Sequence, residues 1–181
     1  MPGETGVWIL IAGDVLVFSL LFVTYLSGRI QNRSQYSLSQ LDLSGVCGAI
    51  NTLLMLFSSW FVAMATRSAR LKRSKETRHF FGMAIACGLG FTLVKYVEYS
   101  TKLHAGITPA TNDFFMFYYV MTGIHLFHVF IGMGVLLVLC RYSLIAPGDV
   151  NMIRNVESGA SFWHAVDVVW IVIFALLYLV R

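Results

Sequence analysis

Five long runs of apolar residues, separated by short polar segments, dominate the pattern along the chain. They cover Val7–Leu26, Val46–Ala65, Phe80–Tyr99, Phe114–Cys140 and Phe162–Val180. A helix rises about 1.5 Å per residue, so roughly 20 apolar residues cross the hydrocarbon core of a bilayer, which is about 30 Å thick. Each run is long enough for one transmembrane helix, and the fourth is long enough to tilt or protrude. The pattern predicts an all-α, polytopic membrane protein built as a bundle of five transmembrane helices.

The segments between the apolar runs are too short to fold as separate domains, and the sequence contains no internal repeat. We therefore expect residues 1–181 to form a single membrane domain. Glycines and serines recur inside the runs, and such small residues let membrane helices approach one another closely. They are Gly48, Ser58, Ser59, Gly88, Gly90, Gly123, Gly132 and Gly134.

Composition supports the membrane interpretation. The chain is 57% hydrophobic and 12% charged, whereas a soluble domain has roughly 25% charged residues. The net charge of +4 is concentrated in one loop, which makes lipid headgroups a better partner for it than nucleic acid. Cys47, Cys87 and Cys140 lie in apolar runs without CxxC spacing, so we expect neither a disulfide framework nor a cysteine metal site.

Basic residues are distributed unequally between the two sides of the predicted bundle. The second and fourth loops carry eight of them, namely Arg67, Arg70, Lys72, Arg73, Lys75, Arg78, Arg141 and Arg154. The opposite side carries four, namely Arg29, Arg33, Lys102 and Arg181. The positive-inside rule then predicts a cytoplasmic N-terminus and an external C-terminus. We expect the six basic residues of the second loop to bind phospholipid headgroups.

Ionisable side chains inside the spans cost about 2.5–3.5 kcal/mol each on insertion scales, so each requires an explanation. Lys95 and Glu98 are three residues apart near the outer end of the third span. We interpret them as an intrahelical ion pair in which the lysine reaches outward to the membrane surface. His164 and Asp167 have the same spacing in the last span. A hydrogen bond shared by these two groups would lower the cost of burying both.

The first span contains one charged residue, Asp14, and the fourth contains two histidines, His125 and His128. Counted along the helices from the predicted inner edge, Asp14 lies about 12 Å deep, His128 about 18 Å and His125 about 22 Å. Because the error of each depth is about 5 Å, Asp14 and His128 are compatible in depth. We predict a hydrogen bond between them across the first and fourth spans, with His125 facing a neighbouring helix or a partner subunit.

A metal site is a less favoured interpretation of the histidines. The same counting places His125 and His164 nearly 20 Å apart in depth. Two histidines on one helix are too few ligands for a structural or redox metal. We expect no metal, haem or other cofactor in this chain.

Several motifs resemble the cytochrome c oxidase subunit III family. "TGIHLFHVFIGM" is similar to the histidine motif of that family, and "ESGASFWHAVDVVWIVIF" is similar to its last helix. "VKYVEYS" and "NDFFMFYYVMTG" resemble two further family segments. "ETGVWILIAGDVLVFSLLFVTY" resembles the first helix that all members share, with Asp14 where the family usually has a carbodiimide-reactive glutamate.

The resemblance implies a non-catalytic subunit without haem or copper, which binds phospholipids and flanks the haem-bearing catalytic subunit of a respiratory complex. It also implies a place in the bacterial cytoplasmic (inner) membrane and a role in supporting proton uptake. The mitochondrial form of the family has seven spans, whereas this chain has five. Its short loops favour the short NorE-type branch, whose members are associated with nitric oxide reductase and denitrification.

Two alternatives remain open at this point. One is subunit III of a bacterial cytochrome c or quinol oxidase, which would belong to aerobic electron transport. The other is an autonomous ion-coupled transporter that uses Asp14, Glu98 and Asp167. Transporters commonly show internal repeats and broken helices, and the sequence shows neither, which favours an accessory subunit.

Overall fold

A computed structural model describes residues 5–145 and 149–180, and within these residues it contains helices and no strand. The elements are α1 (Thr5–Gln31), α2 (Arg33–Leu41), α3 (Gly45–Arg70), α4 (Ser74–His104), α5 (Asp113–Ile145), α6 (Val150–Phe174) and the π-helix η1 (Ala175–Leu179). Within the described residues, five helices are long and apolar enough to cross a membrane, namely α1, α3, α4, α5 and α6 extended by η1. The predicted all-α fold with five spans is therefore confirmed.

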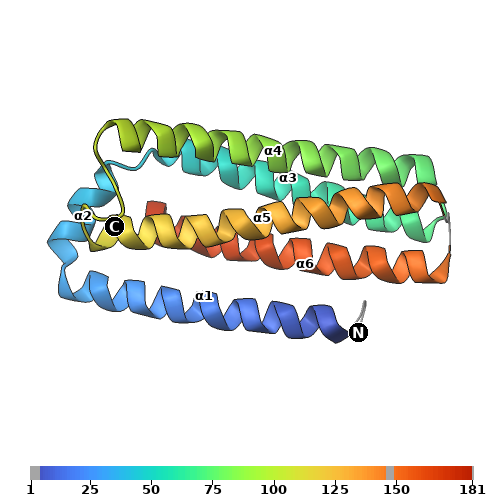
Figure 1. Cartoon of the computed structure of the whole chain (residues 1–181), viewed down its shortest axis with the longest axis horizontal. Helices are drawn as coiled ribbons and strands as arrows, with labels where there is room; N and C mark the ends of the chain where they lie inside the picture. The colour runs from blue at the N-terminus through green and yellow to red at the C-terminus, as the bar shows by residue number, and fades with distance from the viewer. Residues whose placement is uncertain (1–4, 146–148, 181) are drawn as a thin grey trace.

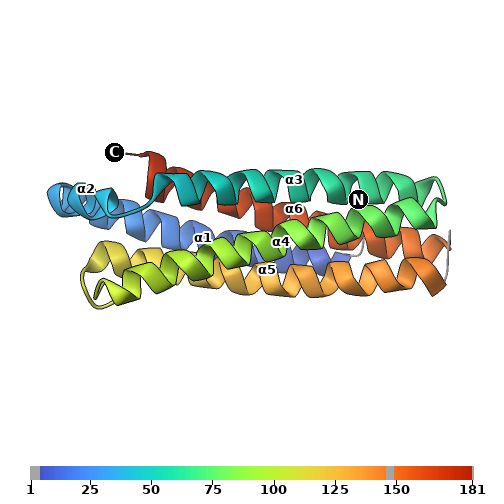
Figure 2. The same cartoon turned by 90° about the horizontal axis from the view of Figure 1, so that it is seen from above.

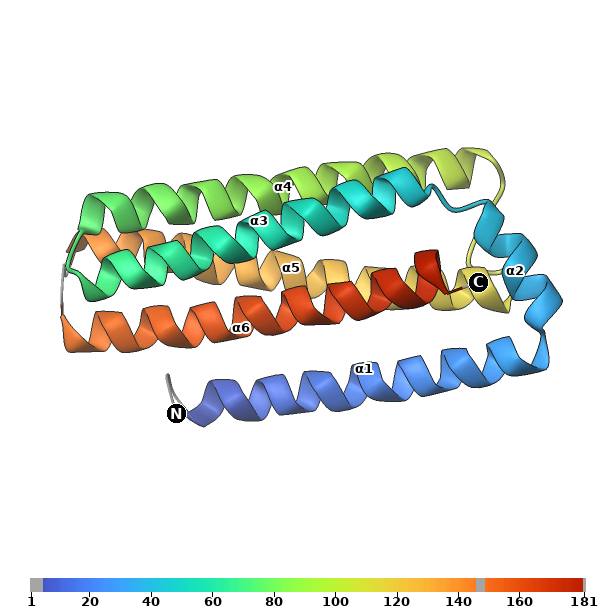
Figure 3. The same ribbon diagram turned by 180° about the vertical axis from the view of Figure 1, so that it is seen from behind.

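The five long helices lie side by side, with α1 at the edge of the bundle (Figure 1, Figure 3). Helices α3, α4, α5 and α6 pack closely, whereas α1 contacts mainly α5 and α6. Of the most apolar 18-residue stretch of α1, 6% is buried, whereas 28–44% of the corresponding stretch is buried in the other four spans. Most of the surface of α1 is consequently free to contact lipid or another protein.

The connections between the helices are divided between the two ends of the bundle. The start of α1, the α3–α4 connection, the end of α5 and the start of α6 lie at one end (Figure 1, Figure 2). Helix α2, the α4–α5 connection and the end of η1 lie at the other. The second and fourth loops thus share an end with the start of the first helix, and we call it the basic end. That it faces the cytoplasm remains a prediction, and Arg181, which entered the charge count, lies outside the described residues.

Helix α2 was not predicted from the sequence. It is only nine residues long and its mean composition is polar. Three hydrogen bonds of 2.9 Å fix the end of this helix. Asn112 Nδ2 donates to Ser39 Oγ, and Gln40 Nε2 donates to the carbonyl oxygen of Leu177. Lys102 Nζ donates to the carbonyl oxygen of Asp42, the residue that follows the helix. The Leu177 carbonyl lies in η1, where the wider π turn changes the helical hydrogen-bond pattern.

Two of the predicted close approaches involve the indole of Trp163. A Cβ added to Gly132 would lie 2.6 Å from a ring carbon of Trp163, and one added to Gly88 would lie 3.3 Å from the same ring. Gly123 and Gly134 face open space, so their small size is not needed for packing among the described residues.

The last helix begins much earlier than its apolar run suggested. The run begins at Phe162, but α6 begins at Val150, so the Glu157 region is helical. His164 lies 14 residues into the helix, about 21 Å along its axis. The helix therefore extends about three turns before the apolar run, toward the basic end.

Candidate functional site

Asp14 on α1 and His128 on α5 lie opposite each other across the two helices. His128 Nε2 is 3.2 Å from Asp14 Oδ1, and His128 Nδ1 is 2.8 Å from the carbonyl oxygen of Ile124. A carbonyl oxygen can only accept, so Nδ1 carries a hydrogen. Nε2 then either accepts from a neutral carboxylic acid or donates, as an imidazolium, to a carboxylate. In both states one proton is shared between α1 and α5.

His125 is one turn away and does not take part in this hydrogen bond. Its side chain is fully buried between the rings of Phe91 (5.5 Å between centroids) and Trp170 (5.2 Å). Neither ring nitrogen has a hydrogen-bond partner among the described residues. Its neighbour Trp170 is six residues from His164, about 9 Å along α6. The depth difference of nearly 20 Å between His125 and His164 is therefore wrong.

Lys95 and Glu98 on α4 form a buried ion pair, with 2.8 Å between Lys95 Nζ and Glu98 Oε2. Tyr178 joins them, because its hydroxyl donates to Glu98 Oε1 over 2.7 Å and accepts from Lys95 Nζ over 3.1 Å. The Lys95 side chain is fully buried and its ammonium lies 5.1 Å from the ring centroid of Trp170. The lysine does not reach outward to the membrane surface as we expected, because the carboxylate, the phenol and the surrounding rings satisfy its charge inside the bundle.

His164 and Asp167 on α6 are close but do not share the hydrogen bond that we expected. His164 Nδ1 is 4.0 Å from Asp167 Oδ2, and instead lies 2.6 Å from Ser59 Oγ on α3. The Asp167 side chain is 5% exposed, and neither of its oxygens has a hydrogen-bond partner of good geometry in residues 5–145 and 149–180. Ser59 was expected only as a small residue for close helix packing, because nothing in its own helix marks it as the partner of a histidine 105 residues away.

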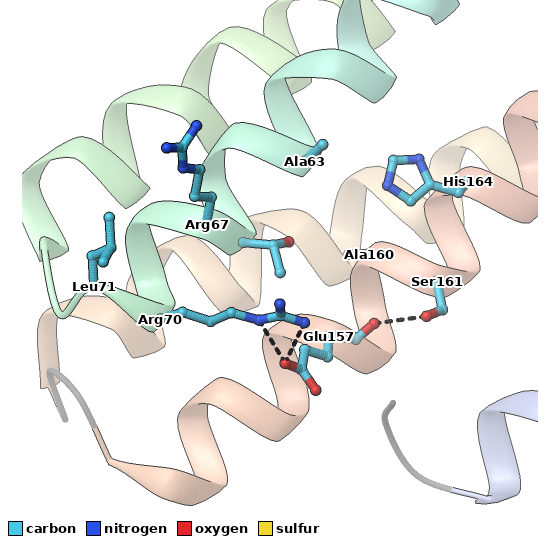
Figure 4. Close-up of a pocket in the computed structure, with 9 residues that line it drawn as sticks. Ala63, Arg67, Arg70, Leu71, Glu157, Ala160, Ser161 and His164 are labelled. Carbon is cyan, nitrogen blue, oxygen red and sulfur yellow. Dashed lines mark hydrogen bonds and ion pairs between the residues drawn. The ribbon is translucent and has the colours of Figure 1, made fainter. Parts of the chain in front are cut away.

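A groove between α3 and α6 opens at the basic end and has a volume of about 490 Å³ (Figure 4). Arg70 and Glu157 form an ion pair across it, with 2.8 Å between the closest atoms, and Arg67 lies beside them. All six basic residues that we expect to bind lipid headgroups are exposed at this end. Of the other four, Arg73 pairs with Glu76 at 3.4 Å.

Metal-binding residues do not gather in the part of the chain that the structure describes. No group of three or more His, Cys, Asp or Glu side chains there has a geometry that could hold a metal ion. Apart from His125, the ionisable side chains discussed above for the spans form three separate sets: the Asp14–His128 contact, the Lys95–Glu98–Tyr178 set and the Ser59–His164–Asp167 set, which we call the α3–α6 cluster.

Known proteins of similar sequence identify the family. The family model described as "Cytochrome c oxidase subunit III" matches residues 3–180. A cytochrome bo(3) ubiquinol oxidase subunit 3 from Buchnera aphidicola subsp. Schizaphis graminum is 28% identical, over 96% of this chain and 92% of its own length. A cytochrome c oxidase subunit 3 from Thermostichus vulcanus is 31% identical, over 96% and 85%. A quinol oxidase subunit 3 from Bacillus subtilis is 28% identical, over 96% and 85%.

These relatives change one expectation. They are named as subunits of cytochrome c and quinol oxidases, and the predicted link to NorE-type proteins and nitric oxide reductase gains no support from them. Short length does not distinguish that branch either, because this chain spans 92% of the Buchnera ubiquinol oxidase subunit. The match over nearly the whole chain, together with the five-span helical fold, shows that the protein belongs to the cytochrome c oxidase subunit III family.

Proposed function

We propose that this protein is a non-catalytic accessory subunit of a bacterial haem-copper oxidase that takes electrons from cytochrome c or from a quinol. The observation that carries the proposal is the family match over residues 3–180, joined by relatives named as subunit 3 of both oxidase types. The expected partner is the haem-bearing catalytic subunit, and the expected location is the bacterial cytoplasmic membrane.

The exposed surface of α1 supports a role within a larger assembly. Large apolar side chains cover it, among them Ile9 (71% exposed), Leu16 (69%) and Leu20 (66%). In the membrane such a surface contacts either lipid or the helices of another subunit. Phospholipids are expected at the exposed arginines and lysines of the basic end, where positive charge attracts anionic headgroups.

Purification in a mild detergent tests the proposal. The chain, carrying an affinity tag at its C-terminus, is extracted from the membranes of its own host, and the proteins that accompany it are identified by mass spectrometry. We expect a haem-copper oxidase catalytic subunit, a haem spectrum, and oxygen consumption with cytochrome c or a quinol.

Two results would contradict the proposal. Recovery of a nitric oxide reductase catalytic subunit, with nitric oxide rather than oxygen consumed, would replace the partner. Purification as a stable assembly of this chain alone, without any haem protein, would instead favour an autonomous membrane protein.

A further inference from the structure

The groove between α3 and α6, which we call the α3–α6 groove, is formed by small side chains on both helices. Ala63 and Thr66 of α3 and Ala160 and Ser161 of α6 line it, and its volume is about 490 Å³. Ala63 and Leu71, which also lines it, are exposed, so the groove is open on the outer surface of the bundle. In a membrane the medium that reaches this surface is lipid.

The walls of the groove are effectively apolar, because their polar atoms are already bonded within the protein. The hydroxyls of Thr66 and Ser161 each donate to the carbonyl four residues earlier in their own helix, over 3.0 and 2.9 Å (Figure 4). At the inner end of the groove, His164 Nδ1 lies 2.6 Å from Ser59 Oγ. Such a surface suits a hydrocarbon chain, which would regain the dispersion contacts that an empty groove lacks.

The mouth of the groove is positively charged. Arg70 pairs with Glu157 across it, with 2.8 Å between the closest atoms. Arg67 also lines the groove, and its guanidinium has no ion-pair or hydrogen-bond partner within residues 5–145 and 149–180. Two arginines and one glutamate leave one positive charge without a counterpart. A phosphate group supplies the missing negative charge and accepts hydrogen bonds from guanidinium groups.

The mouth and the inner end of the groove lie at different depths. The apolar run of α3 ends at Ala65, so Arg67 lies just beyond it. On α6 the apolar run begins after Glu157 and includes His164. The seven residues from Glu157 to His164 span about 10 Å along the helix. The groove thus leads from the level of the lipid headgroups to the level of the acyl chains, as a site for one phospholipid requires.

We propose that the α3–α6 groove binds one anionic phospholipid. Its phosphate lies at Arg67 and Arg70, and one of its acyl chains lies against Ala63 and Ala160. Glu157 holds the guanidinium of Arg70 at the mouth through the ion pair. The acyl chain fills the volume that the small side chains leave between the two helices.

The site gives the lipid binding proposed above for the basic end a defined place, and it rests on that part of the proposed function. It does not depend on an oxidase partner. A helix of another subunit is the competing occupant of an apolar groove in the membrane. The uncompensated positive charge at the mouth, at headgroup level, favours the lipid.

Photo-crosslinking of the full-length protein tests the site. The protein is reconstituted into phosphatidylcholine vesicles that contain a small fraction of phosphatidylglycerol with a diazirine near the middle of one acyl chain. After irradiation, mass spectrometry locates the labelled residues. We expect label at Ala63 and Ala160, and we expect added phosphatidylglycerol, but not added phosphatidylcholine, to compete it away. Label on the exposed face of α4, at Met83 and Leu89, measures contact with bulk lipid and serves as the reference.

Two variants, each with a matched control, test the headgroup and the acyl-chain contacts. Arg67→Gln should lower the groove label relative to the α4 reference by about fivefold, which corresponds to the roughly 1 kcal/mol that one basic residue near the membrane surface contributes. Arg78→Gln, at an exposed arginine that does not line the groove, should leave the ratio unchanged. Ala63→Trp fills the groove and should reduce its label to the reference level. Leu53→Trp, at an exposed position of α3 outside the groove, should not.

Three results would overturn the proposal. Equal competition by phosphatidylcholine and phosphatidylglycerol would show that the groove does not select an anionic lipid. Equal effects of Arg67→Gln and Arg78→Gln would leave only a general attraction of lipid to the basic end, so the lipid binding of the proposed function would survive without this site. A groove that resists the lipid label and crosslinks to another subunit would be a protein interface. If Arg67→Gln fails to fold, as judged by gel filtration, Ala63→Trp and Leu53→Trp decide the question.

Discussion

Removing either member of the Asp14–His128 contact is expected to loosen α1 from the rest of the bundle. The contact joins α1 and α5 over 3.2 Å. Few other side chains anchor α1 to the bundle, because only 6% of its most apolar 18-residue stretch is buried. Phe18 (2% exposed) and Tyr25 (fully buried) are two of these anchors. Loss of this polar contact should therefore have a measurable effect on how firmly α1 is held.

The expected magnitude follows from hydrogen bonding in membranes. Interhelical hydrogen bonds contribute about 0.6 kcal/mol on average and up to about 1.7, and bonds to charged groups about 1.5–3. We expect Asp14→Ala and His128→Ala each to lower the free energy of unfolding by about 1–2 kcal/mol. Because each change removes the same bond, the double variant should cost little more than either single one. The coupling energy should be about 1 kcal/mol.

Unfolding in mixed micelles, by titration with SDS, measures these free energies. The control pair is Thr24→Ala with His128→Ala, because the Thr24 hydroxyl bonds to the carbonyl of Leu20 in its own helix. That pair should be additive within about 0.5 kcal/mol. Additive effects in the Asp14–His128 pair itself would show that the contact contributes nothing to stability, and the reasoning above would be refuted.

The remaining predictions concern topology and packing. A cysteine at Ser74, in an otherwise cysteine-free chain, should not react with an impermeant thiol reagent added to intact cells, and labelling from outside would reverse the predicted orientation. Lys95→Met should destabilise the bundle by about 3–5 kcal/mol because it strands Glu98, and adding Glu98→Gln should restore part of the loss; no recovery would mean that the pair is not coupled. Gly132→Ala should lower the free energy of unfolding by about 1–3 kcal/mol, because the added methyl group overpacks against Trp163. Gly134 faces open space, so Gly134→Ala should change that free energy little. Equal effects of the two substitutions would contradict the close approach of Gly132 to Trp163.

Most of the fold was accessible from the sequence because hydrocarbon imposes a strong constraint on it. A helix that crosses the bilayer must satisfy its own backbone and present apolar side chains over about 20 residues. That requirement identified the five spans and the two ends at which their connections lie. It does not apply outside the hydrocarbon, so α2 and the first three turns of α6 were missed. Both segments contain polar residues that no hydropathy criterion separates from a loop.

Polar contacts inside the bundle were predictable only in part. The depth of a residue in the membrane can be counted from the sequence, but the neighbouring helix that its side chain faces cannot. The first span contains a single charged residue, Asp14, so matching depths left His128 as its best partner, and the two side chains lie 3.2 Å apart. Depth alone did not reveal that His125, on the same helix, points toward Phe91 and Trp170 instead. Sequence spacing gives the face of a helix, but not which neighbour that face meets.

The α3–α6 cluster shows the same separation more clearly. Spacing along one helix placed His164 beside Asp167, and their side chains are indeed neighbours, but the 2.6 Å contact of His164 is with Ser59 of another helix. A serine or threonine in an apolar helix can bond to the carbonyl four residues earlier, as Thr52 and Thr66 do here. Ser59 differs because it faces α6 at the level where that helix presents a histidine. Its partner depends on how α3 and α6 meet, and the spacing of residues along either helix alone does not contain that information.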